Sequence, residues 1–169
     1  MTSRSACHLE IERKFLVQGS FPRDPSPIEI VQGYLKSSKG NELRVRSENR
    51  NYFLTHKHRV DAISAEETTC SLPSSIGAEL LQLCTGGQLI QKRRHIIETD
   101  GFLWEVDEYL GRYLGLFVAE IELSHSKQTF RMPAWVGEEV TQDPRFKNAV
   151  LFRSRMSTNN LTTKSHVGV

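Results

Sequence analysis

Charged side chains recur at every second residue in five short stretches of this 169-residue chain. Alternate side chains on a β-strand point to the same face and lie about 7 Å apart, so each stretch predicts one charged face and one apolar face. Apart from Lys14, each stretch carries charges of a single sign. The five sets are Glu10, Glu12 and Lys14; Arg44 and Arg46; Lys92 and Arg94; Glu105 and Asp107; and Glu120 and Glu122. Because acidic rows attract divalent metal ions and basic rows attract phosphate groups, these residue types indicate a site for a polyphosphate and its metal.

Two arrangements of these strands are consistent with the pattern. In the first, amphipathic strands turn their charged faces to water and pack their apolar faces on a core, as half-buried antiparallel strands commonly do. In the second, the sheet closes into a barrel whose apolar faces are covered by a helix and loops, and the charged faces point inward. Since burying unpaired charges is costly, the interior of such a barrel would be a water-filled channel that binds ions. The sorting of charges by sign favours the second arrangement.

The elements that hold these side chains follow from the same alternation. Turn-forming residues, among them Lys39-Gly40-Asn41 and Asp100-Gly101, separate the charged stretches and indicate antiparallel hairpins. A helical period predicts an amphipathic helix around Ile76 to Cys84, after serines able to cap it, and a shorter helical stretch around Arg145 to Phe152. The predicted strands are Leu9 to Val17, Glu42 to Ser47, Tyr52 to Lys57, Leu89 to Ile97, Leu103 to Asp107 and Val118 to Leu123.

Composition and charge limit the classes of protein to consider. The chain has 22 Lys and Arg against 20 Asp and Glu, a net charge of +2, which is too small to indicate attraction to nucleic acid or to a membrane surface. Its three cysteines are widely spaced, so a reducing, cytoplasmic setting is expected rather than a disulfide framework. No apolar run approaches the roughly 20 residues that span a bilayer. We expect one domain over residues 1–153 and a flexible tail over 154–169.

The stretch from Glu10 to Val17 resembles the ExExK signature of the CYTH superfamily, the triphosphate tunnel metalloenzymes. The similarity continues in order along roughly residues 8 to 152, and Pro133 to Thr141 resembles the closing segment of the short bacterial members. The matches between these two are Gln32-Gly33-Tyr34-Leu35, Arg44-Val45-Arg46, Leu54-Thr55-His56-Lys57, Lys92-Arg93-Arg94, Trp104-Glu105-Val106-Asp107 and Ala119-Glu120-Ile121-Glu122-Leu123. ExExK alone is a weak signal, but an ordered series of this length is a specific one.

This resemblance implies a mainly β fold of the α+β class, in which eight antiparallel strands close into a barrel around a tunnel and a few helices flank it. It implies that Mg²⁺ or Mn²⁺ is held by Glu10, Glu12, Asp107, Glu120 and Glu122, with Glu67 and Glu105 as further acids of the tunnel. Hard carboxylate oxygens suit these metals. The triphosphate would be held by Lys14, Arg44, Arg46, Lys57, Lys92 and Arg94.

Tyr34 and Lys57 resemble a pair assigned to water activation in short bacterial members, which makes them the candidate catalytic residues. A tyrosine that faces the core and a lysine that only binds phosphate are equally consistent with the sequence. The family commonly has an RxExE run where this chain reads Ala65-Glu66-Glu67-Thr68-Thr69, so one basic and one acidic side chain are replaced. This departure predicts a change in activity or substrate preference rather than in fold.

The expected function is that of a metal-dependent triphosphatase that hydrolyses the terminal phosphoanhydride of inorganic tripolyphosphate or a related triphosphate. A class IV adenylate cyclase, which converts ATP to cyclic AMP and pyrophosphate, is the alternative enzyme, although the sequence shows no identifiable purine pocket. Thiamine triphosphate as the substrate, and a non-catalytic polyphosphate-binding module, are further alternatives. The expected partner is a triphosphate substrate, and neither nucleic acid nor a membrane is expected. Dimers occur in the family that the chain resembles, but no residue of the sequence indicates a homodimer here.

Overall fold

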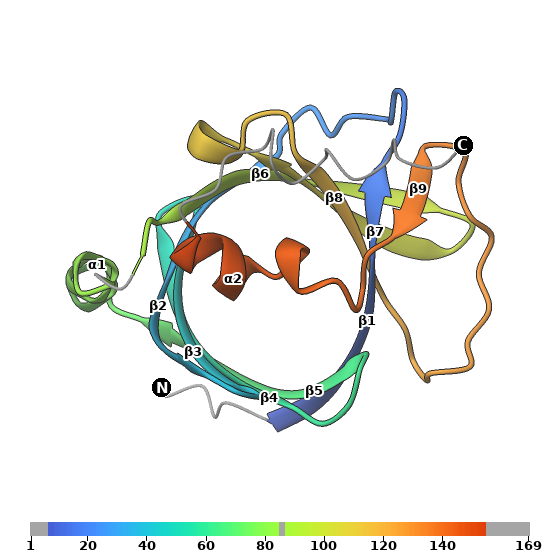
Figure 1. Ribbon diagram of the computed structural model, residues 1–169. Coiled ribbons are helices and arrows are strands. Elements are labelled where there is room, and N and C mark those ends of the chain that lie inside the picture. The colour runs from blue at the N-terminus through green and yellow to red at the C-terminus, as the bar shows by residue number, and fades with distance from the viewer. Residues whose placement is uncertain (1–6, 85–86, 155–169) are drawn as a thin grey trace.

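Eight antiparallel strands form a closed barrel in a computed structural model, which describes residues 7–84 and 87–154 (Figure 1). The strands are β1 (Cys7–Val17), β2 (Ile28–Ser38), β3 (Asn41–Glu48), β4 (Asn51–Arg59), β5 (Ser64–Leu72), β6 (Ile90–Thr99), β7 (Phe102–Tyr109) and β8 (Phe117–Glu122). They are hydrogen-bonded in the order β5-β4-β3-β2-β6-β7-β8-β1, and a second pairing of β1 with β5 closes the ring. The predicted eight-stranded barrel is therefore confirmed. Most of the predicted tail, 155–169, lies outside the described residues.

The hairpins turn where the sequence predicts them. In the turn between β6 and β7, Asp100 and Gly101 both have positive φ, 51° and 76°, as a tight hairpin connection requires. Gly40 has φ of 79° between β2 and β3, a value that glycine adopts without strain. These short connections keep sequential strands adjacent and antiparallel.

Two strands of the barrel carry no clear apolar alternation and were not among the six predicted from it. β5 reads SAEETTCSL, in which six of the nine residues are Ser, Thr or Glu, and it is held between β4 and β1 by backbone pairing. β2 carries Gln32 and Gly33 in the middle of an apolar stretch that spans only Ile30 to Leu35. A short strand, β9 (Val136–Glu139), pairs with the end of β1 outside the closed ring.

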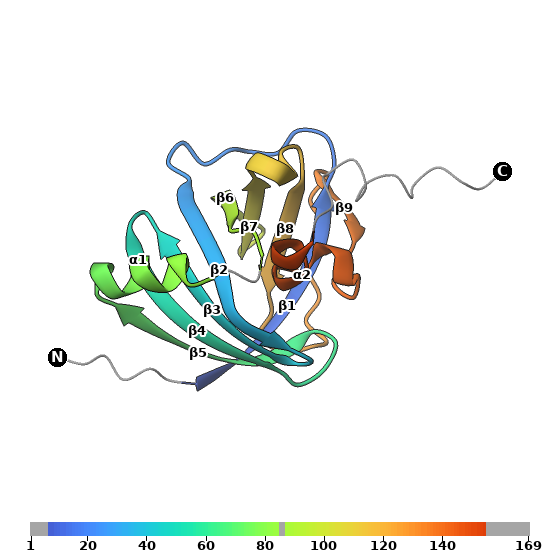
Figure 2. The same ribbon diagram turned by 60° about the vertical axis from the view of Figure 1, so that its left-hand side comes forward.

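The two predicted helical segments have different outcomes. The first is confirmed as α1 (Ser74–Gln82), which lies outside the barrel against β3 and β4 (Figures 1 and 2). The second is interrupted, because η2 (Pro144–Phe146) and α2 (Asn148–Arg153) are separated by Lys147 in an extended conformation. A further short turn, η1 (Gly111–Tyr113), precedes β8. None of the helices described is long and apolar enough to cross a membrane.

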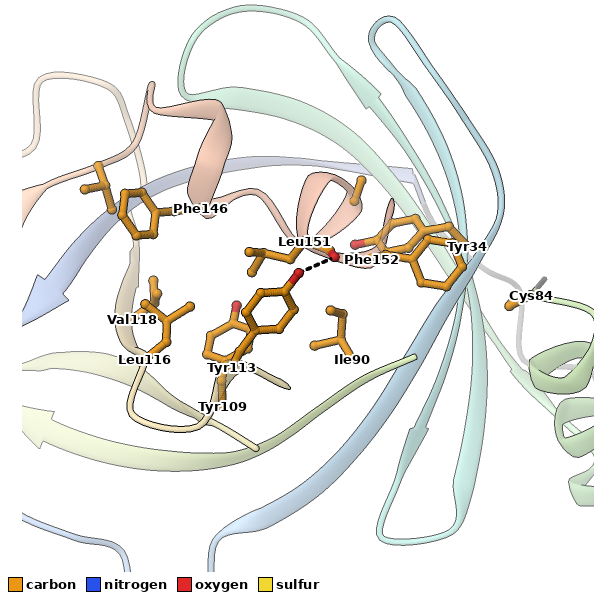
Figure 3. Packing of buried hydrophobic residues seen from close by; sticks show 12 residues of the cluster. Tyr34, Cys84, Ile90, Tyr109, Tyr113, Leu116, Val118, Phe146, Leu151 and Phe152 are labelled. Carbon is orange, nitrogen blue, oxygen red and sulfur yellow. Dashed lines mark hydrogen bonds between the residues drawn. The ribbon is translucent and has the colours of Figure 1, made fainter. Parts of the chain in front are cut away.

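Two apolar clusters stabilise the barrel from different sides. One covers the outer face of β1, β7 and β8, where Phe15 and Trp104 pack together and Trp104 contacts Trp135 of the segment that leads to β9. The other joins α2 to side chains of the barrel, and α2 lies across the opening of the ring in the view of Figure 1. In this second cluster the Tyr113 hydroxyl donates to the carbonyl oxygen of Leu151 over 2.7 Å (Figure 3). Apolar side chains are thus buried on the outside of the barrel and around α2. The charged faces of the strands line the remaining part of the interior.

Candidate active site

A cavity of about 420 Å³ occupies the barrel interior, and all eight strands contribute to its lining. The charged rows therefore face inward, as the second of the two arrangements requires. Three predicted site residues do not line this cavity, namely Tyr34, Lys92 and Asp107, all of which are buried. The predicted residues that do line it are Glu10, Glu12, Lys14, Arg44, Arg46, Lys57, Glu67, Arg94, Glu105, Glu120 and Glu122.

Lys57 lies among the acids of β1 and β5. Its ammonium group forms ion pairs with Glu10, with Glu12 over 3.3 Å and with Glu67 over 3.7 Å. The register of the sheet explains this meeting, because Lys57 of β4 pairs directly with Glu67 of β5 and β5 continues onto β1. One ammonium group thus pairs with three carboxylates, so the net charge on this side of the cavity is negative when all three are ionised.

Lys14 stands on the same row of β1 and connects it to β8. It contacts Glu12 over 3.2 Å and forms a close ion pair with Glu120, whose backbone is its direct partner across the two strands. Carboxylates of Glu12 and Glu120 are brought together by this one ammonium group.

Arg94 and Lys92 share the carboxylate of Asp107, which is fully buried. Arg94 donates from Nε and Nη2 to the two oxygens of Asp107, each over 2.8 Å, and reaches Glu120 over 3.4 Å. It also forms an ion pair with Glu105 at the cavity. Asp107 therefore binds Arg94 in a bidentate interaction on the side away from the cavity, and the guanidinium group lines the cavity.

Arg44 and Arg46 form the basic row of β3. Arg44 reaches Glu67 over 3.5 Å, and its buried Nε has no hydrogen-bond partner among the described residues. Arg46 lies 2.9 Å from Glu48. A buried guanidinium N–H without a partner is costly, so Arg44 has a donor that an anionic ligand in the cavity would satisfy.

Tyr34 and Lys57, the predicted catalytic pair, lie in different surroundings. The Tyr34 ring packs against Phe152 of α2 with centroids 5.4 Å apart, and its hydroxyl accepts a hydrogen bond from the Gln32 amide over 3.2 Å. Burial raises the pKa of Tyr34, so the phenol stays neutral. Its contact with the charged interior is through Arg44, its partner on β3.

Burial and neighbouring charges set the protonation of the acids. Burial raises the pKa of Glu10, and the nearby Glu12 carboxylate adds to the rise. Burial acts in the same direction on Glu12 and Glu120, but the attraction of Lys14 and of further cations outweighs it and lowers the pKa of both. Glu12 and Glu120 therefore stay ionised at neutral pH, whereas Glu10 holds a proton more readily than a free glutamate.

A model of the CYTH domain matches residues 8–148, which is most of the chain. The chain belongs to the CYTH domain family. It is 38% identical over 146 residues to the inorganic triphosphatase of Acetivibrio thermocellus, covering 86% of this chain and 94% of the relative. The inorganic triphosphatase of Nitrosomonas europaea is 36% identical over 147 residues, covering 84% of this chain and 95% of the relative.

Solved structures agree with this assignment. The crystal structure of an inorganic triphosphatase superposes with a TM-score of 0.65 at 33% identity, covering 88% of this chain and 97% of the other. A putative adenylyl cyclase from Hippeastrum, described with a dominant triphosphatase activity, shares the fold with a TM-score of 0.52 at 15% identity, covering 69% of this chain and 80% of the other.

The acids of this CYTH domain are hard oxygen donors of the kind that Mg²⁺ and Mn²⁺ prefer. Their side chains stand against lysine and arginine, and no three of the acidic, histidine or cysteine side chains in the described ranges are grouped closely enough to hold an ion. The donor chemistry fits a divalent metal, and the ammonium groups of Lys14 and Lys57 occupy the positions next to these oxygens. Glu122 is exposed at the cavity lining, whereas Asp107 already uses both oxygens on cations.

The departures from the family pattern lie on β5. Ala65 is buried and pairs with Glu10 of β1, so a long basic side chain is absent from that point. The Thr69 hydroxyl lies 2.8 Å from that of Thr55 and donates to Glu67 over 3.3 Å. A neutral hydroxyl pair thus stands at the position where the family commonly has an acid.

The CYTH cavity also includes residues that the sequence analysis did not single out. Glu48 continues the inward row of Arg44 and Arg46 by one more period, so the alternation contained the signal for it. His8 extends the β1 row in the same way. Asn148 comes from α2, and nothing in its local sequence indicates that it reaches the barrel interior.

Proposed function

We propose that this CYTH domain is a phosphoanhydride hydrolase whose substrate is inorganic tripolyphosphate or a closely related triphosphate. The observation that carries the proposal is the enclosed cavity in which Arg44, Arg46 and Arg94 face a row of carboxylates on β1 and β8. The family membership and the names of the curated relatives support the same reaction class. Hydrolysis of tripolyphosphate needs no recognition of a base, which agrees with a lining dominated by charged groups.

The basic residues would bind and orient the phosphate chain. Arginine forks contact two oxygens at once and lysine acts as a compact charge, so Arg44, Arg46 and Arg94 suit the chain while Lys14 and Lys57 suit single oxygens. Phosphoryl transfer depends mainly on positioning and on cations placed where negative charge develops. Lys92 would act from behind Arg94, since it is buried against Asp107.

Glu10, Glu12, Glu120 and Glu122 would hold Mg²⁺ or Mn²⁺ at the acidic side of the cavity. Bound there, such an ion supplies neutralisation of phosphate oxygens and a lower pKa for a water molecule. Binding requires that the carboxylates of Glu12 and Glu120 exchange the ammonium group of Lys14 for the ion. Lys14 is then free to contact phosphate. Asp107 is better suited to holding Lys92 and Arg94 than to binding metal.

Lys57 is the candidate to orient the attacking water by donating a hydrogen bond, because its ammonium group lies among carboxylates at the cavity wall. Tyr34 would contribute as a positioning residue for Arg44. In a Tyr34→Phe variant this role predicts a rise in KM with little change in kcat, whereas direct action on the water predicts a fall in kcat.

The decisive assay offers purified protein tripolyphosphate, ATP and thiamine triphosphate with Mg²⁺ or Mn²⁺, and measures orthophosphate, pyrophosphate and cyclic AMP. We expect orthophosphate and pyrophosphate from tripolyphosphate, and no turnover after chelation of the metal. Cyclic AMP from ATP would instead identify a cyclase, and binding without turnover would identify a polyphosphate-binding module.

An Arg44→Ala variant tests the role of the basic row. We expect weaker binding of tripolyphosphate by about 1.5–3 kcal/mol, the usual loss for a hydrogen bond to a charged group. Lys127→Ala removes an exposed cation from the loop after β8 and is the matched control. Equal apparent affinities of the two variants would contradict the assignment of Arg44.

A further inference from the structure

A second cavity of about 340 Å³ lies where the hairpin of β2 and β3 and the end of β4 meet η2 and α2. Its lining differs from that of the first cavity in charge. The charged side chains that line it are Lys39, Lys57, Arg59, Lys147, Arg153 and Glu42. Five cations therefore surround one carboxylate, whereas cations and acids are intermixed in the first cavity.

Lys57 is already paired with acids of the first cavity, but the two arginines of the second cavity are not neutralised by their hydrogen-bond partners. Arg59 donates to the carbonyl oxygen of Ala62 and Arg153 to that of Ser37, each over 3.2 Å. Both acceptors are uncharged. Partial burial lowers the pKa of Lys147, and the like charge of Arg59 and Lys14 adds to this lowering, although Glu42 acts in the opposite direction. Several cations thus face one small space, an arrangement that costs free energy unless an anion binds there.

Lys57 connects the two cavities because it lines both of them. The start of α2 also separates them, since Asn148 lines the first and its neighbour Lys147 lines the second. An anion in the second cavity would therefore lie on the other side of Lys57 from the acids of β1. The second cavity is adjacent to the candidate active site but has its own set of cations.

We propose that the second cavity is a phosphate-binding site, occupied either by orthophosphate or by the distal phosphate of a polyphosphate chain. A phosphate group is tetrahedral and multiply charged, so its oxygens can accept hydrogen bonds from several directions at once. The cations of this cavity come from four different segments and can supply such donors. The identity of the occupant, as product or substrate, rests on the proposed hydrolase function. The binding of a phosphate group by these cations does not depend on it.

The test measures binding of inorganic phosphate by calorimetry at fixed ionic strength to wild type, to R59Q/K147Q and to the control K127Q/R131Q. The control removes the same two charges from exposed positions in the loop between β8 and β9. We expect R59Q/K147Q to lose one phosphate site or to bind at least tenfold more weakly, and the control to behave as wild type. Equal phosphate binding by all three proteins, or no binding by wild type, would overturn the proposal.

A second variant keeps the test informative if R59Q/K147Q does not fold, which its thermal unfolding would reveal. Glu42→Gln removes the one carboxylate of this lining, so it should tighten phosphate binding severalfold. Unchanged or weaker binding in Glu42→Gln would count against the site.

Kinetics with tripolyphosphate then separate the two sources of phosphate. Weaker inhibition of R59Q/K147Q by orthophosphate at an unchanged KM would identify the released product as the occupant. A raised KM would identify the distal phosphate of the substrate. Absence of hydrolysis by wild type would overturn the proposed function alone, because calorimetry of phosphate binding needs no turnover.

Discussion

Asp107 shows how one buried carboxylate organises two basic residues of the cavity wall. It is fully buried and receives Arg94 through two hydrogen bonds, and Lys92 forms an ion pair with it. Burial lowers the pKa of Lys92 to about 8, against the opposing effect of Asp107. The charge of Lys92 at neutral pH therefore depends on this carboxylate.

Asp107→Asn should destabilise the fold and weaken substrate binding together. Replacing the carboxylate removes the bidentate partner of Arg94, which then keeps only Glu105 and Glu120 as counter-charges. It also lets Lys92 lose its proton at a lower pH. We expect a fall of roughly 3–5 kcal/mol in the free energy of unfolding, the typical cost of breaking a buried ion pair from one side. Urea unfolding measures the first effect and the KM for tripolyphosphate the second.

Glu98→Gln is the control for this substitution, because Glu98 is an exposed acid at the end of β6. Its free energy of unfolding should stay within about 0.5 kcal/mol of the wild-type value. If Asp107→Asn unfolded at the same urea concentration as this control, the buried ion cluster would not contribute as described.

At the scale of elements, α2 is held by the barrel through hydrogen bonds and aromatic packing. The Tyr109 hydroxyl donates to the Asn148 side chain over 2.6 Å, and Tyr113 donates to the carbonyl oxygen of Leu151 (Figure 3). Phe152 is buried against Tyr34. A helix of only six residues would not be stable alone, so these contacts fix its position between the two cavities.

Phe152→Ala should lower the free energy of unfolding by about 3–5 kcal/mol, because it opens a space in the cluster that joins α2 to the barrel. It should also let Tyr34 move, and so weaken tripolyphosphate binding. Leu114→Ala, which removes a side chain that is 67% exposed, is the matched control and should change stability by less than about 0.5 kcal/mol. Thermal and urea unfolding compare the two, and equal midpoints would contradict this role of α2.

At the scale of the whole molecule, the ion network links stability to pH. Burial alone would raise the pKa of Glu120, but Lys14 and Arg94 outweigh it, so the folded-state pKa lies well below the usual 4.5. A carboxylate with a depressed pKa contributes stability that is present above its unfolded-state pKa and is lost as the pH falls through the folded-state value. This contribution should therefore be complete at neutral pH.

The difference in free energy of unfolding between wild type and Glu120→Gln should be largest near pH 7 and should shrink as the pH falls below about 4.5. Urea unfolding at a series of pH values measures this difference directly. A difference that stays constant down to pH 3 would show that the ionised form of Glu120 gains nothing from Lys14 and Arg94.

Strands, hairpins and family follow from the order of the amino acids alone. Alternation identified six strands and placed the charges of each on one face, since a period of two fixes which side chains share a face. The sorting of these charges by sign favoured the arrangement in which they point inward. The turn residues located the hairpins, and the ordered motifs identified the family. The cytoplasmic location stays a prediction from the sequence.

The depth of each charged side chain, and the charged groups that it contacts, depend on how the barrel closes. Asp107 and Glu122 are both acids on inward rows, yet Asp107 is fully buried and Glu122 is exposed. Alternation cannot separate them, because depth along a barrel depends on the stagger of its strands and on closure, here through the polar β5. The second cavity likewise exists only because α2 meets the β2–β3 hairpin, more than 100 residues away in the chain.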